Sequence, residues 1–331
     1  MRKLHLKPLA EQVVVITGGS SGIGAATGQA AARAGARVVL AGRDADALDK
    51  VAESIRKDGG DVSTFVMDVG HEEDHQKLLQ AALDTYGAVD TWVNNAGVSI
   101  FGTLQSVPLE DQRKLFETDY WGVVYGSLMA VSYLRDRGGA LINVGSEVSD
   151  RAIPMQGAYS AAKHAVKGFT DALRMELMQE KAPISVTLIK PGSIDTNYTR
   201  RARNYMDVEP VLPPPVYAPE LVAKVILYAA QKPERDLYVG SAAKMMATLG
   251  QRAPGLSDAL AGWLTRHQRS DVPATQEGDG LYEPAIRSAT PSPSHVRRHS
   301  FYTHVNTRGK GAFWLGTGAL LLIGSALARR R

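Results

Sequence analysis

Three side chains in the middle of the sequence have the types and spacing needed to pass a proton to or from an oxygen atom. Tyr159 and Lys163 are four residues apart at the start of a strongly helical segment, so their side chains lie one turn apart on one face. A phenol with a pKa of about 10 is a poor acid or base at neutral pH, and a nearby ammonium lowers that pKa by stabilising the phenolate. Ser146 precedes Tyr159 by 13 residues, and its hydroxyl could hold the reacting oxygen beside the phenol. Because Tyr-x-x-x-Lys alone is common by chance, its interpretation depends on the elements around it.

A glycine-rich loop near the N-terminus has the pattern of a phosphate-binding turn. It follows an apolar run, Val13 to Thr17, and leads into a helix of small residues expected from Ile23 to Ala34. A pyrophosphate needs close approach of the backbone and free amide donors at a helix N-terminus. Glycines allow that approach because they have no Cβ. A tight turn is the alternative, but the placement between strand and helix predicts a dinucleotide site formed by Thr17, Gly18, Ser20, Ser21, Gly22, Ile23 and Gly24.

Short apolar runs alternate with longer helical stretches from Val13 to about Val239, which is typical of repeated βαβ units. Several runs are almost entirely apolar, as expected of strands that are covered on both faces. The sequence therefore predicts an α/β fold, a doubly wound parallel sheet of about seven strands flanked by helices. The expected strands are Val13 to Thr17, Arg37 to Ala41, Val62 to Met67, Thr91 to Asn94, Ala140 to Val144, Ile184 to Ile189 and Leu237 to Val239. The clearest helices are Ile23 to Ala34, Leu109 to Leu134 and Ala158 to Glu180.

Further motifs follow the glycine-rich loop in order, each at the expected end of a strand. They are Asp68-Val69, Asn94-Asn95-Ala96-Gly97 and Pro191-Gly192-Ser193-Ile194-Asp195-Thr196. Together with Thr-Gly-x-x-x-Gly-x-Gly at residues 17–24 and the Ser, Tyr and Lys set, they make residues 10–245 resemble the short-chain dehydrogenases/reductases. This family has a single-domain Rossmann fold, so the resemblance implies the same α/β fold as the strand pattern.

The resemblance implies an oxidoreductase that transfers a hydride between a nicotinamide cofactor and an alcohol/carbonyl substrate. Tyr159 would be the general acid/base, Lys163 would tune it and hold the nicotinamide ribose, and Ser146 would orient the substrate oxygen. The implied cofactor contacts are Asp68 and Val69 at the adenine, Asn95, Ala96 and Gly97 along the cleft, and Pro191, Gly192, Ile194 and Thr196 at the nicotinamide. Relatives assemble through helices that resemble Leu109 to Leu134 and Ala158 to Glu180, so a homodimer or homotetramer is expected.

Asp119 departs from the pattern of the family. Relatives often carry Asn at this place in the long helix, where it helps to hold a water for proton relay. If a backbone carbonyl plays that part, Asp can substitute for Asn. If the amide side chain is required, the relay is altered and the pH profile shifts. Asp119 is therefore a candidate catalytic residue whose contribution the sequence leaves open.

The end of the second expected strand, Leu40 to Arg43, bears on the choice of cofactor. NAD-specific relatives usually place an acid where Gly42 stands, so that it accepts from the ribose 2′-hydroxyl. That acid is missing here, and Arg43 could meet a 2′-phosphate with charge-assisted hydrogen bonds. The alternatives are a solvated arginine and an Asp44 that serves NAD. The sequence favours NADP(H), with NAD(H) as the alternative.

Composition excludes several other functions. The chain has no cysteine, so disulfides, thiolate nucleophiles and cysteine-ligated metal sites are excluded. Residues 1–280 carry a net charge of −3, which argues against a nucleic-acid groove in the main domain. The stretch His71 to His75 matches a zinc-protease pattern, but no third ligand is evident and no metal is expected. Arg200, Arg201 and Arg203 lie where the family has its mobile substrate lid; we interpret them as a solvated helix face, with preference for an acidic substrate as the alternative.

The C-terminal part of the chain differs in character from the rest. Residues 270–300 are rich in Pro, Ser, Thr and Gly, which predicts a linker or disordered segment. Ala312 to Ala328 is uncharged and lies between basic residues, which predicts a membrane-spanning helix or, alternatively, an interfacial or partner-packed one. We therefore expect a catalytic domain over residues 1–250, an extension over 251–310 and a hydrophobic helix over 311–331. This organisation predicts a cytoplasmic catalytic domain anchored to a membrane, with a lipophilic substrate.

Two other functions remain open on the sequence alone. One is a dinucleotide-binding sensor without catalysis, but sensors of this fold usually lose the Ser146, Tyr159 and Lys163 set that is present here. The other is a membrane-attached scaffold in which the fold only supports the tail. Turnover of a nicotinamide cofactor would distinguish an enzyme from both.

Overall fold

Seven parallel strands form the central sheet of the computed structural model, which describes residues 4–275 and 277–307. In spatial order they are β11 (Asp236–Val239), β7 (Ile184–Pro191), β6 (Gly139–Val144), β4 (Thr91–Asn94), β1 (Val13–Thr17), β2 (Arg37–Gly42) and β3 (Val62–Val66). Strand order reverses beside β1, which is paired in parallel with both β2 and β4. A doubly wound sheet of this kind opens a crevice at the carboxyl ends of its strands. The predicted fold and all seven predicted strands are confirmed.

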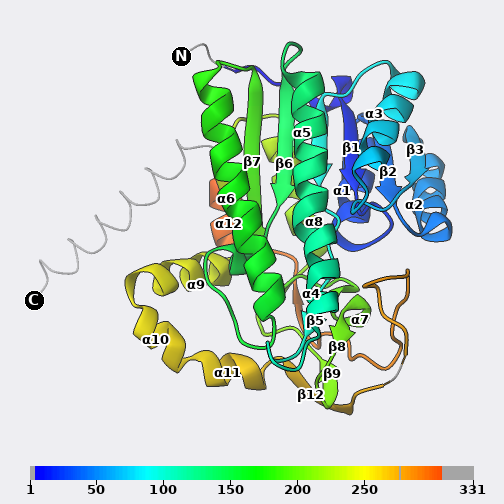
Figure 1. Ribbon diagram of the computed structural model, residues 1–331. Helices are drawn as coiled ribbons and strands as arrows, with labels where there is room; N and C mark the ends of the chain where they lie inside the picture. The colour runs from blue at the N-terminus through cyan, green and yellow to red at the C-terminus, as the bar shows by residue number, and fades with distance from the viewer. Residues whose placement is uncertain (1–3, 276, 308–331) are drawn as a thin grey trace, which may run out of the picture.

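Helices cover both faces of the sheet (Figure 1). One face carries α1 (Gly22–Arg33), α2 (Ala45–Lys57) and α8 (Pro219–Ala229), and the other carries α3 (Glu72–Tyr86), α5 (Gly122–Leu134) and α6 (Gly157–Gln179). Alternate residues of β1 point to opposite faces: Val14 and Ile16 pack with the first set of helices, whereas Val13 and Val15 pack with the second. Burial on both faces explains why these strands are continuous apolar runs.

The predicted helix Leu109 to Leu134 is interrupted in the structure. It consists of α4 (Leu109–Phe116), one π-helical turn η2 (Glu117–Trp121) and α5. A π turn places one extra residue in the helix and turns the following side chains, and such turns often occur at functional sites. Asp119 lies on this turn and is completely buried. The interruption therefore brings a carboxylate into the interior, which a regular helical pattern does not indicate.

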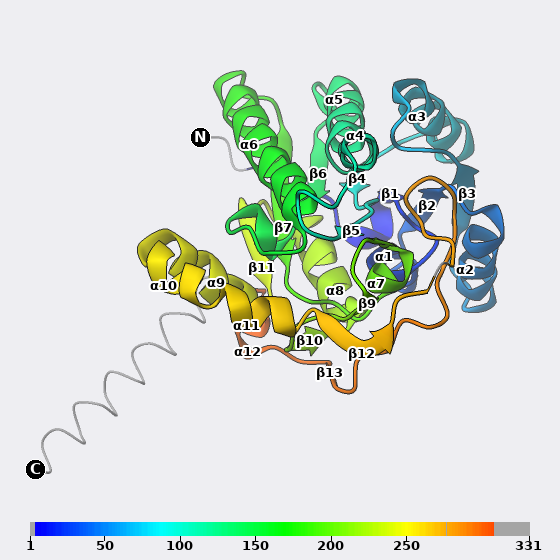
Figure 2. The ribbon, with the colours of Figure 1, turned by 60° about the horizontal axis from the view of Figure 1, so that its bottom comes forward.

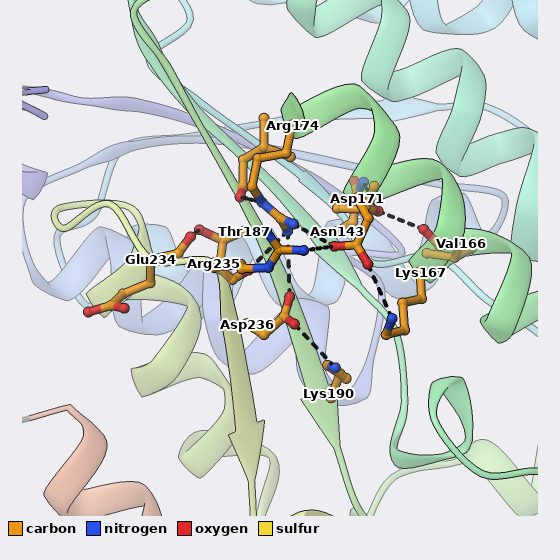
Figure 3. A network of polar contacts seen from close by, with 12 residues as sticks. Asn143, Val166, Lys167, Asp171, Arg174, Thr187, Lys190, Glu234, Arg235 and Asp236 are labelled. Atoms are coloured by element: carbon orange, nitrogen blue, oxygen red, sulfur yellow. Dashed lines mark hydrogen bonds and ion pairs between the residues drawn. The ribbon is translucent and has the colours of Figure 1, made fainter. Parts of the chain in front are cut away.

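A polar network joins α6 to the sheet edge at β7 and β11 (Figure 3). Arg174 donates through Nε to the carbonyl of Val186 at 2.8 Å and through Nη1 to Asp171 at 2.6 Å. Asp171 also accepts from Arg235 at 2.9 Å. The contact fixes α6, the helix that begins next to Tyr159, against two strands through charge-assisted hydrogen bonds.

The segment after β11 wraps around one end of the molecule (Figures 1 and 2). At this end it lies beside residues 198–217, which we call the lid. The segment after β11 contains α9 (Ser241–Arg252), α10 (Pro254–Ala259), α11 (Ala261–Arg266), β12 (Arg269–Pro273), β13 (Val296–Arg297) and α12 (Phe301–Asn306). The lid and its surroundings contain β5 (Ile100–Phe101), α7 (Tyr198–Arg201), β8 (Arg203–Asn204), β9 (Val208–Pro210) and β10 (Val216–Tyr217). Strand β12 pairs with β9, and β13 pairs with β10. A short 3-10 turn, η1 (Leu9–Glu11), precedes β1.

The packing of residues 270–300 differs from the linker or disordered segment that composition predicts. Leu281 is completely buried, and the buried Arg287 donates to the carbonyl of Ala202. Thr290 donates to the buried carboxylate of Glu209 at 2.6 Å. A few buried polar anchors and backbone pairing with the lid hold this segment, and neither feature raises its average hydrophobicity. The average composition of residues 270–300 therefore does not reveal that this segment packs against the lid.

The predicted membrane helix, Ala312 to Ala328, lies outside the described residues, as does the expected unit 311–331. Within residues 4–275 and 277–307, no helix combines the length and the apolar character that a membrane crossing requires.

Candidate active site

One cavity lies at the carboxyl ends of the central strands and collects most of the residues singled out in the sequence. The predicted residues on its wall are Gly18, Ser20, Ser21, Gly22, Ile23, Asn95, Ala96, Gly97, Asp119, Ser146, Tyr159, Lys163, Pro191, Gly192, Ile194 and Thr196. They come from four different loops and from α6 and η2, and the sheet brings them together because all the loops follow parallel strands. The glycine-rich loop and the Ser, Tyr and Lys set therefore face the same space.

The glycine-rich loop is shaped by contacts that a larger residue would break. Gly18 has a φ of +66°, and a Cβ there would lie 2.8 Å from Cα of Ala96. A Cβ on Gly24 would lie 2.1 Å from the carbonyl oxygen of Gly18. Thr17 lies behind the loop, where its Oγ1 accepts hydrogen bonds from the backbone N–H of Asn95 at 3.0 Å and of Ala96 at 3.2 Å. The backbone is thus exposed to the cavity beside the N-terminus of α1, which suits the phosphates of a dinucleotide.

Ser146 is held by the turn that follows β6. It is the N-cap of the 3-10 helix η3 (Glu147–Ser149), where its Oγ accepts from Val148 N–H at 3.3 Å. Its own N–H donates to Oγ of Ser149 at 3.1 Å, which completes a capping box. Because Ser146 acts as an acceptor in the cap, its hydroxyl proton is available to Tyr159, and the hydrogen bond from Ser146 helps to lower the pKa of Tyr159.

Tyr159 and Lys163 lie one turn apart at the start of α6, as their spacing predicts. Lys163 Nζ is 5.6 Å from the centre of the Tyr159 ring. The Lys163 ammonium also forms an ion pair with Asp119, with 3.1 Å between Nζ and Oδ2, and both side chains are buried. The second oxygen of Asp119 accepts from Val98 N–H at 2.7 Å. The side chain of Asp119, which the sequence left without a defined contribution, thus contacts Lys163 directly.

The charges around Tyr159 oppose one another. Burial raises the pKa of Tyr159, the Lys163 ammonium lowers it, and the Asp119 carboxylate raises it again, with the net result above its ordinary value. The sequence predicts that the ammonium lowers the phenol pKa, but it does not reveal the burial and the carboxylate that outweigh this effect. Burial lowers the pKa of Lys163, but Asp119 and Tyr159 raise it more, so that Lys163 stays charged at neutral pH.

Replacing Asp119 by Asn tests this balance. The substitution removes a negative charge that raises the Tyr159 pKa, so the phenolate forms at lower pH. We expect the acid limb of kcat/KM for alcohol oxidation to move to lower pH. The measurement is a pH–rate profile of the variant and of wild type, with Asp84→Asn on the exposed surface of α3 as the control for charge alone. A limb that stays in place, or that moves upward, contradicts the expected influence of Asp119.

Tyr198 and Glu147 are two of the cavity residues that the sequence analysis did not single out. Tyr198 lies edge-on to Tyr159, with 5.5 Å between ring centres, and its hydroxyl donates to Gln156 at 2.6 Å and contacts Ser99 at 2.7 Å. Glu147 follows Ser146 and also lines the cavity. Tyr198 belongs to no sequence motif. It reaches the cavity only because the lid folds over this end of the molecule. Glu147 could have been found from its place next to Ser146, where a charged residue is unusual beside a buried strand.

Five predicted cofactor residues lie off the cavity wall: Thr17 and Gly24, which shape the glycine-rich loop from behind, and Arg43, Asp68 and Val69. Arg43 donates through Nη1 to the carbonyls of Tyr282 at 2.9 Å and Leu281 at 3.3 Å. Asp68 accepts from Gly70 N–H at 2.9 Å and lies 3.7 Å from Lys114 Nζ. The carbonyl of Val69 contacts a ring nitrogen of His75 at 2.9 Å. The side chain of His75, the second histidine of the His71 to His75 stretch, is completely buried.

The fold and the cavity define a dinucleotide-binding α/β oxidoreductase: a glycine-rich loop, a phenol and an ammonium share one crevice at the carboxyl ends of a doubly wound sheet. The chain belongs to the short-chain dehydrogenase/reductase family, because the family model described as short chain dehydrogenase matches residues 12–207. It is an oxidoreductase that acts on the alcohol/carbonyl pair with a nicotinamide dinucleotide as cofactor.

Several relatives agree with this assignment. The chain is 44% identical over 313 residues to the uncharacterized oxidoreductase YxnA of Bacillus subtilis, covering 92% of this chain and 88% of the relative. It is 35% identical over 199 residues to 11-beta-hydroxysteroid dehydrogenase A of Sesamum indicum, covering 60% of this chain and 56% of the relative.

Solved structures show the same fold. An alcohol dehydrogenase from Thermococcus sibiricus complexed with 5-hydroxy-NADP has a TM-score of 0.60 and 27% identity, and the match covers 69% of this chain and 95% of that one. A short chain dehydrogenase/reductase from Burkholderia phymatum in complex with NAD has a TM-score of 0.69 at 23% identity, covering 82% and 100% of the two chains.

Proposed function

We propose that the protein uses NADP(H) to interconvert an alcohol and a carbonyl on a lipophilic substrate, with Tyr159 as general acid/base. The observation that carries the proposal is the meeting of Ser146, Tyr159 and Lys163 with the glycine-rich loop on one cavity wall. Proton transfer needs a group within hydrogen-bonding reach of the reacting oxygen, and hydride transfer needs the cofactor beside the same carbon. A single crevice that contains both sets satisfies these requirements.

In alcohol oxidation, the Tyr159 phenolate accepts the proton of the substrate hydroxyl. Ser146 donates its hydroxyl proton to the same oxygen and holds it in place, since its cap hydrogen bond uses the serine only as an acceptor. Lys163 stabilises the phenolate by its charge, and Asp119 fixes the position of Lys163. The nicotinamide, when bound, accepts the hydride. In carbonyl reduction, the same groups act in the opposite direction, and Tyr159 donates the proton.

The cofactor contacts proposed for this chain follow the exposed backbone of the loop. Gly18, Ser20, Ser21, Gly22 and Ile23 would hold the pyrophosphate at the N-terminus of α1. Asn95, Ala96 and Gly97 would line the ribose, and Pro191, Gly192, Ile194 and Thr196 would hold the nicotinamide end. Thr17 and Gly24 would act from behind by shaping the loop. Asp68 and Val69 remain proposed neighbours of the adenine.

The preference for NADP(H) is supported by two arginines near the end of β2. Arg43 is held by carbonyl oxygens of residues 280–282, which fix its direction but do not neutralise its charge. Arg201 lines the cavity and is close enough to Arg43 for the two charges to repel, which together with burial lowers the pKa of Arg201. Within the described part of the chain, Arg201 Nε is buried without a hydrogen-bond partner, and neither arginine forms an ion pair. The Asp44 carboxylate raises the pKa of Arg201 and so offsets part of this effect, but two guanidinium groups without an ion-pair partner would still suit a phosphate.

Substituting each arginine by Met tests this preference. We expect Arg43→Met and Arg201→Met to weaken NADPH binding by about tenfold or more, because each loses a hydrogen bond to a charged group. NADH should lose little if the 2′-phosphate is the partner. Dissociation constants measured by calorimetry for both cofactors check this, with the exposed Arg33→Met on α1 as control. Equal losses for NADPH and NADH would assign the arginines to the pyrophosphate, and no loss for either would end the NADP(H) proposal.

A lipophilic substrate is supported by apolar residues on the cavity wall. Val148, Ile153, Leu212 and Pro213 contribute apolar surface there, and the last two come from the lid. The proposed assembly into a homodimer or homotetramer is supported by exposed apolar side chains on η2, α5 and α6: Trp121, Leu128, Met175 and Met178.

Membrane attachment through residues 312–328 remains a proposal from the sequence. We expect the full chain to pellet with membranes, whereas a truncation that ends at Gly309 stays in the supernatant. The measurement is fractionation of cells that express each form at equal level. Equal partition of the two forms would remove the anchor and, with it, the proposed location of the catalytic domain at a membrane.

The catalytic proposal is tested by turnover. NADPH consumption is followed with ketones and aldehydes, and NADP+ reduction is followed with alcohols. Cofactor binding with no turnover on any member of the panel would favour the dinucleotide-binding sensor instead.

A further inference from the structure

Glu147 places a carboxyl group in the cavity that the proposed chemistry does not use. It is the first residue of η3, directly after Ser146, and it lines the cavity together with Ser146 and Tyr159. Its Oε2 lies against Gly192, where an added Cβ would be 3.3 Å from that oxygen. Gly192 also lines the cavity, in the segment proposed to hold the nicotinamide end. The carboxyl group therefore lies on the side of the cavity where a substrate must bind.

This carboxyl group has no partner within the described part of the chain. No hydrogen bond or ion pair involves its side chain, and burial alone raises the pKa of Glu147 to about 7. The cations nearest in sequence are occupied elsewhere: Arg151 pairs with Asp258, and Lys190 pairs with Asp150 at 2.9 Å. By surface exposure Glu147 is only partly buried, because its carboxyl group faces the cavity, and a carboxyl group there without a protein partner is available to a ligand.

Several polar side chains on the cavity wall already have partners. The Tyr198 hydroxyl bridges Gln156 and Ser99, and Gln156 donates to Gln268 at 2.7 Å. Ser146 and Tyr159 are assigned to the reacting oxygen. The neighbours Val148 and Ile153 are apolar. Glu147 is thus a carboxyl group on the cavity wall that remains available to a second part of the substrate.

We propose that Glu147 selects substrates that carry a second hydrogen-bond donor, a hydroxyl or a protonated amine, in addition to the reacting alcohol or carbonyl. This inference rests on the proposed function, because it takes the oxygen held by Ser146 and Tyr159 as the reacting one. The substrate class is then a diol, a hydroxy ketone or an amino alcohol with an apolar body. An apolar substrate without the donor leaves the carboxyl group unsatisfied, and sites with buried polar groups reject such analogues strongly.

Cyclohexanol and its derivatives test the selection with a constant apolar body. The probes are cyclohexanol, the 1,2-, 1,3- and 1,4-cyclohexanediols and the corresponding aminocyclohexanols, with wild type, Glu147→Gln and Glu147→Leu. We expect wild type to prefer at least one diol or amino alcohol over cyclohexanol by about tenfold or more in kcat/KM. Glu147→Leu should reduce that ratio to near one, chiefly through KM. Glu147→Gln, which keeps the shape and an acceptor oxygen, should retain the preference for the diol and lose the preference for the amine.

A binding measurement separates this inference from the proposed function. Calorimetry of the same probes with NADP+-saturated protein reports selection without turnover, and NADPH affinity should stay within about twofold in both variants. If no probe is turned over, the proposed function fails, while the binding ratios still decide the inference. Equal ratios in wild type and Glu147→Leu, or no preference in wild type by either readout, overturn it. A loss of NADPH affinity with unchanged probe ratios also overturns it, because Glu147 would then contact the cofactor.

Discussion

Tyr159→Phe is expected to lower kcat by at least about a thousandfold at neutral pH while it leaves NADPH affinity within about twofold. The substitution removes only the hydroxyl that exchanges the proton with the substrate oxygen, and general acid/base catalysis contributes rate factors of about this size. The ring remains and still packs beside Tyr198 at 5.5 Å between centres. Steady-state kinetics and a calorimetric titration with NADPH measure the two quantities separately.

Tyr198→Phe is the matched control for this experiment. It removes a second phenol in the same cavity, together with its hydrogen bonds to Gln156 and Ser99. Because Tyr198 has no neighbouring ammonium in the way that Tyr159 has Lys163, we expect the control to keep kcat within about tenfold of wild type. If Tyr198→Phe loses more activity than Tyr159→Phe, the general acid/base has been assigned to the wrong phenol.

Lys163→Met is the second substitution with a large expected effect, and it acts on both activity and stability. Loss of the ammonium removes the charge that lowers the Tyr159 pKa, and we expect kcat/KM to fall by about a hundredfold or more. The same change leaves the Asp119 carboxylate buried without its cation. Breaking a buried pair on one side costs about 3–5 kcal/mol, so the free energy of unfolding should fall by that order. Activity assays and urea denaturation measure the two effects.

The double variant Asp119→Asn/Lys163→Met separates these effects. A neutral amide at position 119 can still accept from Val98 N–H and no longer carries a buried charge. We therefore expect the double variant to recover most of the lost stability but none of the lost activity. Activity that returned together with stability would show that Lys163 acts only through the fold, and would remove it from the proposed chemistry.

The sequence could predict the sheet because most of its strands are buried on both faces and several end in a recognisable loop. Val13 to Thr17 illustrates this. Four buried apolar residues and a threonine lead into a glycine-rich turn, which is the pattern of a central strand in a parallel sheet. The meeting of Ser146, Tyr159 and Lys163 with the glycine-rich loop was also predictable. Their separate positions in the sequence all map to the carboxyl ends of parallel strands or to the helix that begins beside them.

What the sequence could not supply depends on tertiary contacts. The π turn that buries Asp119 is a local change in helix register, and the residues 117–121 carry no pattern that distinguishes it from a regular helix. The docking of residues 270–300 depends on single buried anchors such as Arg287, which average composition hides. The net pKa of Tyr159 depends on the depth of burial, which outweighs the ammonium that the motif reveals. Arg201, interpreted as part of a solvated helix face, instead lines the cavity.

The most direct measurement is a crystal structure of the protein with NADP+ and a bound alcohol. The proposed mechanism predicts that the alcohol oxygen lies within hydrogen-bonding distance of both Tyr159 Oη and Ser146 Oγ, with its carbon about 3–3.5 Å from the nicotinamide ring. A nicotinamide that binds away from the Tyr159 side of the cavity, or an alcohol oxygen held by other groups, would contradict it.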